Sequence, residues 1–193
     1  MSAAQALLSG SPFKLSDKPY DWLGSGSYFW EWDILRAYEW AVQWRSKDPC
    51  VVGAVIELGN CLDLTTRKGA EAVMEAHTTY LELMRITGSP VRENKKAKTD
   101  EAGDVTLRFL DREVMEHLHA SYKIVSKKTN GSVKEFDTVR ALFPEGKELY
   151  PGAGFWDKTH VQIAVKEVAQ IRGVFRVPIR ELKALNIPDV YRF

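Results

Sequence analysis

The chain lacks most of the features that mark specialised protein classes. Its only two cysteines, Cys50 and Cys61, match no zinc-binding spacing and are too few for a disulfide framework. Free thiols in a reducing compartment, the cytoplasm, are therefore expected. No apolar run approaches the ~20 residues of a membrane-spanning helix, and the first residues lack the basic region and apolar block of a signal peptide. We expect neither export nor a membrane partner.

The sequence also has little net charge, no internal repeat and no low-complexity block. Its formal charge of +1 excludes a global attraction to nucleic acid or acidic membranes. A hydrophobic content of 45% and a charged content of 27% are typical of a soluble globular protein. With 193 residues, the chain fits one domain spanning its whole length and can bury a sizeable core.

Hydrophobic periodicity predicts sheet at both ends of the chain and helices in the middle, which is an α+β class. The helix-like middle is expected to form an insert over residues 65–125. Helices are expected over 2–8, with Ser2 as a cap, and over 34–44, 67–86, 111–122 and 179–185. Strands are expected over 50–58, 136–143, 161–165 and 173–177.

Between the two helices of the insert lies a basic segment over residues 90–103. It carries Arg92, Lys95, Lys96 and Lys98 and almost nothing apolar. A solvated surface loop is the favoured interpretation. The alternative is a contact with phosphate or RNA, because lysine clusters neutralise backbone charge, but the segment has no interleaved aromatic residues.

The most informative segment is a glycine-spaced turn followed by aromatic residues. Residues 24–30 read Gly-Ser-Gly-Ser-Tyr-Phe-Trp, and the helix that follows carries Trp40. Two aromatic faces, Tyr28 and Trp40, can hold a flat and partly cationic ring between them. The alternative is that these aromatic residues belong to the core. Gly24 and Gly26 favour the binding interpretation, because glycine admits a close backbone approach.

Two separated segments resemble one enzyme family. Residues 23–29, Leu-Gly-Ser-Gly-Ser-Tyr-Phe, followed by residues 36–41, Arg-Ala-Tyr-Glu-Trp-Ala, resemble the donor-site segment of ADP-ribosyltransferases of the diphtheria-toxin and poly(ADP-ribose) polymerase type. In that family a Gly-x-Gly-x-Tyr-Phe strand leads into a helix whose small residue and aromatic residue line the nicotinamide pocket. Residues 159–165, Thr-His-Val-Gln-Ile-Ala-Val, are similar to the strand that carries the third catalytic residue.

The resemblance implies an ADP-ribosyltransferase-like split β-sheet core with a helical insert. It also implies that NAD is the donor substrate and that no metal is required. The first motif of the family, a strand carrying histidine or arginine and then glycine, should precede the helix over residues 2–8. The sequence has no residues there. We expect an N-terminally truncated chain that lacks the first strand; the alternatives are that another segment substitutes for this strand or that the protein has lost catalysis.

The resemblance assigns Tyr28 to the middle of the His-Tyr-Glu triad, with its ring against the nicotinamide. The donor pocket would consist of Gly24, Gly26, Tyr28, Phe29, Ala37 and Trp40. Gln162 falls where polymerase-type enzymes have a glutamate. A glutamine can hold the ribose hydroxyl but supplies no negative charge to the developing cation, which favours single transfer or NAD cleavage over chain elongation.

His160 is the third catalytic candidate, because alternation along a strand places it on the same face as Gln162. The alternatives are that Gln162 lies on the polar face of a half-buried strand and that His160 is structural. His117 and His119 lie two residues apart on a predicted helix and so do not share a face. We therefore expect no metal site there.

The loop over residues 149–158 lies where the family places its acceptor-recognition loop. Its candidate contacts are Tyr150, Phe155, Trp156 and Lys158. Aromatic side chains on a glycine-hinged loop suit a protein side chain or an unstacked base equally well. The alternative is a hydrophobic clasp over the core.

The resemblance therefore implies a mono-ADP-ribosyltransferase, a glycosyltransferase that moves ADP-ribose from NAD to a protein or nucleic acid in a bacterial cytoplasm. Enzymes of this kind often act as toxins or defence effectors, and a cognate antitoxin would then be a partner. The alternative hypothesis is a catalytically inactive binding module of the same fold, which holds an ADP-ribose-like ligand or a partner protein.

Overall fold

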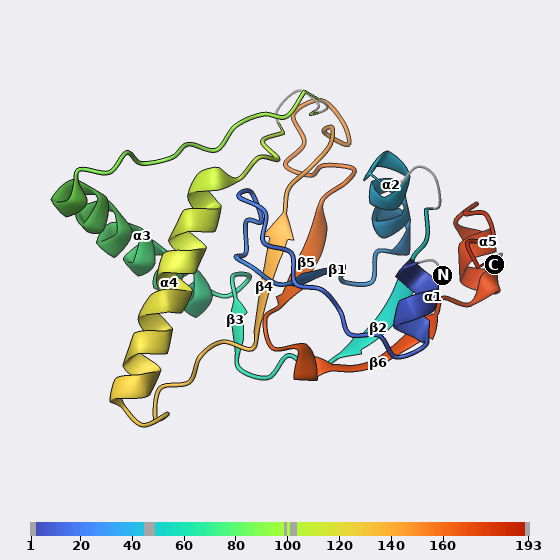
Figure 1. Ribbon diagram of the computed structural model, residues 1–193. Coiled ribbons are helices and arrows are strands. Elements are labelled where there is room, and N and C mark those ends of the chain that lie inside the picture. The colour runs from blue at the N-terminus through green and yellow to red at the C-terminus, as the bar shows by residue number, and fades with distance from the viewer. Residues whose placement is uncertain (1–2, 45–48, 99, 101–103, 192–193) are drawn as a thin grey trace.

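The computed structural model describes residues 3–44, 49–98, 100 and 104–191. Ser2, the expected helix cap, lies outside the described residues. In chain order the elements are α1 (Ala3–Leu8), β1 (Ser27–Trp30), α2 (Ile34–Trp44), β2 (Val52–Ile56), β3 (Cys61–Asp63), α3 (Arg67–Thr87), α4 (Phe109–Lys128), β4 (Thr138–Phe143), β5 (His160–Val165), a 3₁₀ turn (Val168–Gln170), β6 (Ile171–Arg176) and α5 (Ile179–Ala184) (Figure 1).

The strands form two separate sheets, and the mixture of helices and sheets confirms the expected α+β class. The larger sheet has the order β1-β5-β4-β3, and the smaller one pairs β2 with β6. Within the larger sheet, β5 runs antiparallel to both β1 and β4, whereas β3 runs parallel to β4. Trp30 of β1 and Ala141 of β4 both lie opposite Gln162 of β5. Directly opposed residues share a face, so this register defines which side chains meet.

Element boundaries follow local signals where these are strong. Helix α2 has the predicted bounds, and the Asp33 carboxylate accepts the Arg36 N–H at 2.8 Å as an N-terminal cap. Helix α3 begins with Thr66 accepting the Gly69 N–H and ends at Gly88, which adopts a φ of 64°. Helix α4 extends beyond the predicted 111–122 at both ends, and the short strand β3 was not predicted.

The main core lies between one face of the larger sheet and the α3–α4 hairpin. Its buried members come from both layers and from the turn before β1: Leu23, Leu62, Ala76, Tyr80, Val114, Met115, Leu118, Val139, Ala141 and Ala164. The two helices expected as an insert therefore supply one side of the core. In Figure 1 they stand together on the left of the sheet.

A second, smaller core joins the two-stranded sheet to the C-terminal segment. The Tyr191 hydroxyl donates to the Val51 carbonyl and accepts the Val177 N–H, both at 2.6 Å, which ties the end of the chain to β2 and β6. Val51, Val177, Leu182, Ile187 and Val190 pack around it. Ile34, Ala37 and Tyr38 of α2 rest against this cluster. Helix α2 is thereby fixed beside the larger sheet.

No helix in the described residues combines the length and the apolar character that crossing a membrane requires.

Because the α3–α4 hairpin supplies the main core, its buried leucine should contribute far more stability than an exposed one. Leu118 is 1% exposed, and Leu118→Ala should lower the free energy of unfolding by about 2–5 kcal/mol through lost burial and a residual cavity. Leu83 of α3 is 41% exposed, and Leu83→Ala should cost less than about 1 kcal/mol. Urea unfolding monitored by circular dichroism measures both. Equal losses would contradict the assigned core.

Candidate functional site

The hairpin covers only part of the sheet face, and a cleft occupies the other end. Its volume is about 1010 Å³, at the upper end for ligand sites. Strands β1 and β5 line its base, and α2 forms one side. Residues of the segment over 16–22 form another side, and a third side consists of Ala97, Asp100, Asp104, Thr106 and Leu107. Four of the six tryptophans of the chain line the cleft, together with other aromatic residues: Tyr20, Trp22, Tyr28, Trp30, Trp40, Trp44 and Phe143.

Strand alternation places Tyr28 and Trp30 on the cleft face and Phe29 on the opposite face. The Phe29 ring packs against Phe13, with 5.3 Å between ring centroids. On the cleft side, the ring of Trp30 meets Trp40 of α2 at 5.5 Å, tilted by 50°. The Trp40 ring therefore meets Trp30, which the sequence analysis did not assign. Period-2 alternation from Tyr28 was the signal that could have identified it.

Tyr28 uses its hydroxyl to close the turn that precedes β1. The hydroxyl donates to the Gly24 carbonyl at 2.8 Å and accepts the Leu23 N–H at 3.0 Å. Burial, and secondarily the negative charge of Asp21, raise the pKa of this hydroxyl, so it stays protonated. Tyr28 can therefore present a ring to the cleft, but its hydroxyl is committed to the turn.

The close approach expected at Gly24 and Gly26 is made by groups of the chain itself. Gly24 has a φ of 85°, and a Cβ atom there would lie 2.8 Å from Glu116 Oε1. A Cβ atom on Gly26 would lie 3.1 Å from the Val165 carbonyl oxygen of the neighbouring strand. Intrachain packing thus accounts for both glycines.

A chain of hydrogen bonds fixes Gln162 at the base of the cleft. Trp22 Nε1–H donates to Gln162 Oε1 at 2.8 Å, and the Gln162 amide nitrogen lies 2.8 Å from His160 Nε2. His160 Nδ1 lies 2.7 Å from the Lys158 carbonyl oxygen. A carbonyl only accepts, so Nδ1 carries the proton and Nε2 accepts from the amide. The amide orientation and the histidine tautomer are therefore both determined by their partners.

His160 is a buried residue that fixes the amide of Gln162 through a hydrogen bond. Its side chain is 1% exposed and stacks on Phe143, with 5.5 Å between ring centroids and 30° between planes. Burial, and secondarily the nearby Arg36, lower its pKa despite the hydrogen bond to Lys158. A neutral imidazole fits the acceptor role of Nε2. The predicted pairing of His160 with Gln162 on one face is confirmed.

A buried ion pair closes the side of the cleft next to α2. Arg36 Nη2 lies 2.5 Å from Glu145 Oε1, and its Nε lies 3.0 Å from Oε2. The two side chains are 10% and 13% exposed. This fork geometry joins α2 to the end of β4. Arg36 stood inside the quoted motif without a role, and Glu145 was missed because no sequence pattern relates two residues so far apart.

The cleft lining carries more carboxylates than basic groups. Five acidic residues (Asp21, Glu39, Asp100, Asp104 and Glu145) face three basic ones (Lys18, Arg36 and Lys158). Asp104 Oδ1 accepts the buried Gly146 N–H at 3.0 Å, and Asp100 accepts the N–H groups of Ala97 and Thr106. An aromatic lining with an acidic excess favours a planar cation.

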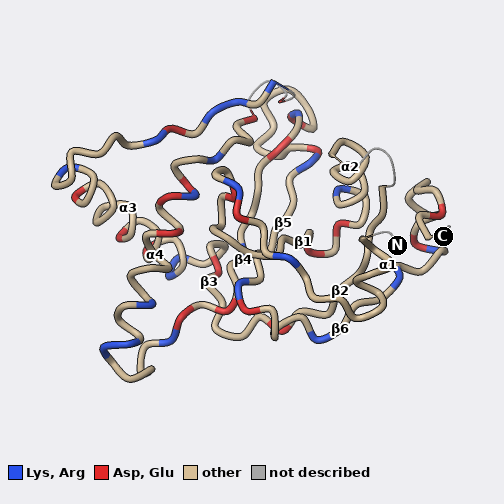
Figure 2. Tube along the Cα trace, viewed as in Figure 1, with Lys and Arg blue, Asp and Glu red and all other residues tan. Residues whose placement is uncertain are grey.

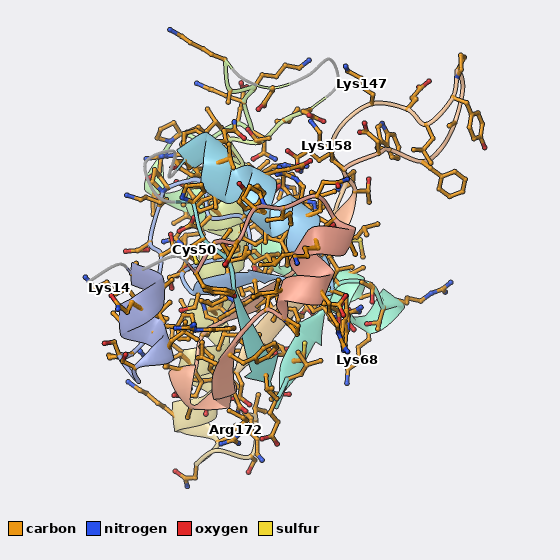
Figure 3. All side chains as sticks on the ribbon, turned by 90° about the vertical axis from the view of Figure 1, so that its right-hand side faces the viewer. Lys14, Cys50, Lys68, Lys147, Lys158 and Arg172 are labelled. Carbon is orange, nitrogen blue, oxygen red and sulfur yellow. The ribbon has the colours of Figure 1, made fainter. Side chains whose placement is uncertain are left out.

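The predicted substrate loop projects from the molecule. Leu149 N–H donates to the Phe155 carbonyl and Asp157 N–H to the Lys147 carbonyl, both at 3.0 Å, so the loop is an internally paired turn. Tyr150, Phe155 and Trp156 are 58%, 63% and 41% exposed, which rules out a clasp over the core. Figure 3 labels Lys147 and Lys158 where the loop leaves the body, and Lys158 lines the cleft.

The basic side chains of the segment are solvated, as the sequence analysis favoured; residues 99 and 101–103 of the segment lie outside the described residues. Lys95, Lys96 and Lys98 are exposed, and Arg92 pairs with Glu113 at 2.9 Å. Figure 2 shows these basic positions in blue along the segment that runs from α3 towards α4. Lys95 and Leu107 exchange backbone hydrogen bonds, which pairs this segment with the residues just before α4, and Leu107 lines the cleft. The contact with phosphate or RNA stays a prediction.

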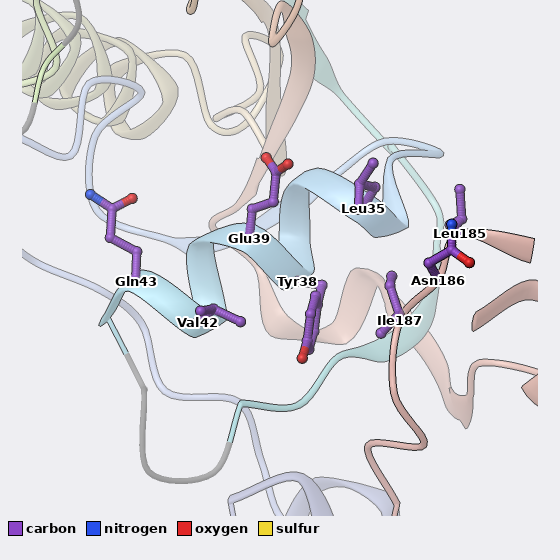
Figure 4. Close-up of a pocket in the computed structure, with 8 residues that line it drawn as sticks. All are labelled: Leu35, Tyr38, Glu39, Val42, Gln43, Leu185, Asn186 and Ile187. Carbon is purple, nitrogen blue, oxygen red and sulfur yellow. The ribbon is translucent and has the colours of Figure 1, made fainter. Parts of the chain in front are cut away.

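A second hollow lies between α2 and residues 185–187 (Figure 4). Its volume is about 440 Å³, and its lining is mainly apolar, through Leu35, Tyr38, Val42 and Ile187. Glu39 is its single carboxylate and also lines the large cleft. Because few polar groups converge on this hollow, we take the aromatic cleft as the candidate site.

The histidines of α4 lie in different surroundings. His117 Nε2 lies 2.9 Å from the Thr79 hydroxyl, whereas the His119 ring packs against Phe136 at 6.2 Å. Within the described residues, no group of three or more His, Cys, Asp or Glu side chains is arranged to hold a metal ion.

The structure brings together part of the predicted set. Tyr28, Trp40, Lys158 and Gln162 line the cleft, and His160 contacts it through Gln162. Outside the lining lie Gly24, Gly26, Phe29, Ala37, Tyr150, Phe155 and Trp156. Comparisons with protein-family models, curated proteins and solved structures find no match to this chain.

Breaking the buried ion pair should be costly, because it leaves Glu145 uncompensated. Arg36→Met should lower the free energy of unfolding by about 3–5 kcal/mol, and R36M/E145L should recover most of that loss. The exposed pair Arg85–Glu82, with an N–O distance of 2.7 Å, is the matched control; Arg85→Met should cost less than about 1 kcal/mol. Urea unfolding at pH 7 compares the four proteins. A double variant as unstable as R36M would contradict this account.

Proposed function

We propose that the protein binds the nicotinamide end of NAD in the aromatic cleft and transfers ADP-ribose to a macromolecular acceptor. The observation that carries this proposal is the contact between the Trp30 and Trp40 rings beside Gln162. Trp30 of β1 lies directly opposite Gln162 of β5 in the strand pair. The resemblance to ADP-ribosyltransferases rests on two segments, and both contribute to this one cleft.

The chemistry of NAD matches the lining. The match concerns the nicotinamide end alone: this ring is planar and positively charged, so aromatic faces and excess carboxylates stabilise the bound ring, although carboxylates do not favour the anionic pyrophosphate. In the transfer, the bond between the nicotinamide nitrogen and ribose C1′ breaks, and its electron pair returns to the ring. The acceptor nucleophile then bonds to C1′ and loses its proton. The ribose passes through a cationic state that a nearby acceptor oxygen stabilises.

Gln162 is the group proposed to hold the nicotinamide ribose. Its Oε1 accepts one hydrogen bond, from Trp22, and an amide oxygen has a second lone pair for a ribose hydroxyl. His160 and Trp22 hold the amide in place, so little ordering is needed when a ligand binds. The exposed loop with Tyr150, Phe155 and Trp156 is proposed to select the acceptor, because its aromatic faces are free of the core.

The second candidate function is an inactive module of this fold that binds an ADP-ribose-like ligand or a partner protein. The supporting observation is Gln162 itself, which supplies hydrogen bonds but no charge at the position where the family has a glutamate. Under the catalytic proposal, the protein would act as a toxin or defence effector in a bacterial cytoplasm, with a cognate antitoxin as a partner. That biological role is supported by the resemblance alone.

Loss of the Trp30 ring should weaken NAD binding, because an aromatic face beside Gln162 disappears and Trp40 loses the ring it packs against. Trp30→Ala should raise the Kd for NAD by about 5- to 30-fold, equivalent to ~1–2 kcal/mol of stacking and cation–π energy. Trp32→Ala, whose side chain is 98% exposed, is the control and should bind like the wild type. Isothermal titration calorimetry with NAD measures this. Wild-type protein that does not bind NAD would sink the proposal.

Restoring a carboxylate at Gln162 should separate the two candidate functions. Gln162→Glu should raise nicotinamide release by about tenfold or more, because the carboxylate neutralises the developing ribose cation, and Gln162→Leu should abolish release. Chromatographic assay of free nicotinamide from NAD measures both variants. NAD binding without release by the wild type or by Q162E would favour the inactive module.

A further inference from the structure

Side chains from distant parts of the chain hold the backbone of the turn at residues 23–26. The Tyr28 hydroxyl satisfies the Leu23 N–H and the Gly24 carbonyl. Gly26 exchanges two backbone hydrogen bonds with Ser16. Ser25 remains, and both of its backbone groups bond to charged side chains. Nearly all backbone polar groups of this turn therefore have a partner within the chain, which stabilises its conformation.

Glu116 reaches this turn from helix α4. Its Oε1 accepts the Ser25 N–H at 2.6 Å, the short distance of a charge-assisted hydrogen bond. The carboxylate can approach because residue 24 is glycine: a Cβ atom at that position would lie 2.8 Å from Glu116 Oε1. Glycine at position 24 therefore permits both the positive φ of the turn and the hydrogen bond between Glu116 and the Ser25 N–H.

Lys166, which directly follows β5, also reaches the turn. Its Nζ donates to the Ser25 carbonyl oxygen at 2.9 Å and lies 4.0 Å from Glu116 Oε1. The Lys166 side chain is 17% exposed. The Glu116 carboxylate thus binds the Ser25 N–H and the Lys166 ammonium binds the Ser25 carbonyl, and their opposite charges partly compensate each other.

Charged neighbours hold the Glu116 carboxylate in its ionised form, whereas burial lowers the pKa of Lys166. Arg112 Nη1 lies 3.2 Å from Glu116 Oε1, and Arg112 also pairs with Asp17. Burial alone would raise the pKa of Glu116, but the Ser25 N–H, Lys166 and Arg112 together hold that pKa below its usual value. His119 packs beside the turn, and burial and Lys166 lower its pKa to about 4, so it adds no positive charge near neutral pH.

We propose that Glu116 and Lys166 are positioning residues that clamp the Ser25 turn and thereby place the cleft residues on either side of it. Trp22, which orients Gln162, precedes the turn, and Tyr28, whose hydroxyl closes it, follows. Helix α4 thus has two roles: it contributes to the core, and through Glu116 it positions cleft residues although it does not line the cleft itself. The consequence for NAD rests on the proposed function, whereas the clamp itself does not.

Nuclear magnetic resonance of the uniformly ¹⁵N-labelled protein tests the clamp without any ligand. Glu116→Gln should accelerate hydrogen exchange of the Ser25 amide by about tenfold or more, because a charged acceptor is replaced by a neutral one. It should also shift the resonance of the Trp22 indole N–H. Lys166→Met should also accelerate Ser25 amide exchange and shift the Trp22 resonance. Lys166→Arg keeps the positive charge and should give wild-type values for both measurements.

Glu113→Gln is the matched control. Glu113 lies on the same helix but contacts Tyr80 and Arg92, so its variant tests a general weakening of α4. It should leave the Ser25 and Trp22 signals unchanged. Unchanged signals in E116Q, or equal changes in E113Q, would overturn the proposal.

Calorimetric titration with NAD provides the functional readout. The Kd should rise about tenfold in E116Q and stay unchanged in E113Q. An altered Ser25 exchange rate with an unchanged Kd would show a clamp that is merely structural and overturn the positioning role. Absence of NAD binding in the wild-type protein would count against the proposed function, and the Trp22 signal would then decide the positioning role alone.

Discussion

The unequal covering of one sheet face determines the rest of this structure. Helices α3 and α4 bury their apolar sides against Val139, Ala141 and Ala164, and the interior closes at that end. At the other end the same face carries Trp30, Phe143 and Gln162. Helix α2 and loops surround this end of the sheet but leave a cleft above it. The cleft is therefore the part of the sheet face that the hairpin does not reach. Its volume and aromatic lining follow from that geometry.

Two groups of polar side chains at the base of the cleft satisfy one another, whereas the buried indole N–H of Trp30 has no partner among the described residues. Trp22, Gln162 and His160 form one chain of hydrogen bonds, and Arg36 and Glu145 form a buried pair beside it. Unsatisfied groups in such a place would be costly, so these partners keep the site in one arrangement before any ligand arrives. Preorganisation of this kind suits both candidate functions. What distinguishes them is the charge at residue 162, because an amide and a carboxylate have nearly the same shape.

The turn before β1 connects the hairpin to the cleft. Gly24 serves an internal purpose there, since it admits Glu116 to the Ser25 N–H. The same residue that carries a family resemblance thus has a structural explanation within this chain. The two explanations are compatible: a tightly held turn fixes the strand that bears Tyr28 and Trp30, and a ring pair is useful for binding only when its members hold still.

The sequence by itself determined what depends on neighbours along the chain. It predicted the bounds of α2, the start of α3, the α+β class and the shared face of His160 and Gln162, because helical and strand periodicities are local properties. It also located Tyr28, Trp40 and Gln162 in the cleft. Only the tertiary structure decided that Trp30 meets Trp40, that Glu145 pairs with Arg36 and that Glu116 accepts the Ser25 N–H. Those contacts depend on strand order, register and helix placement, which no local pattern encodes.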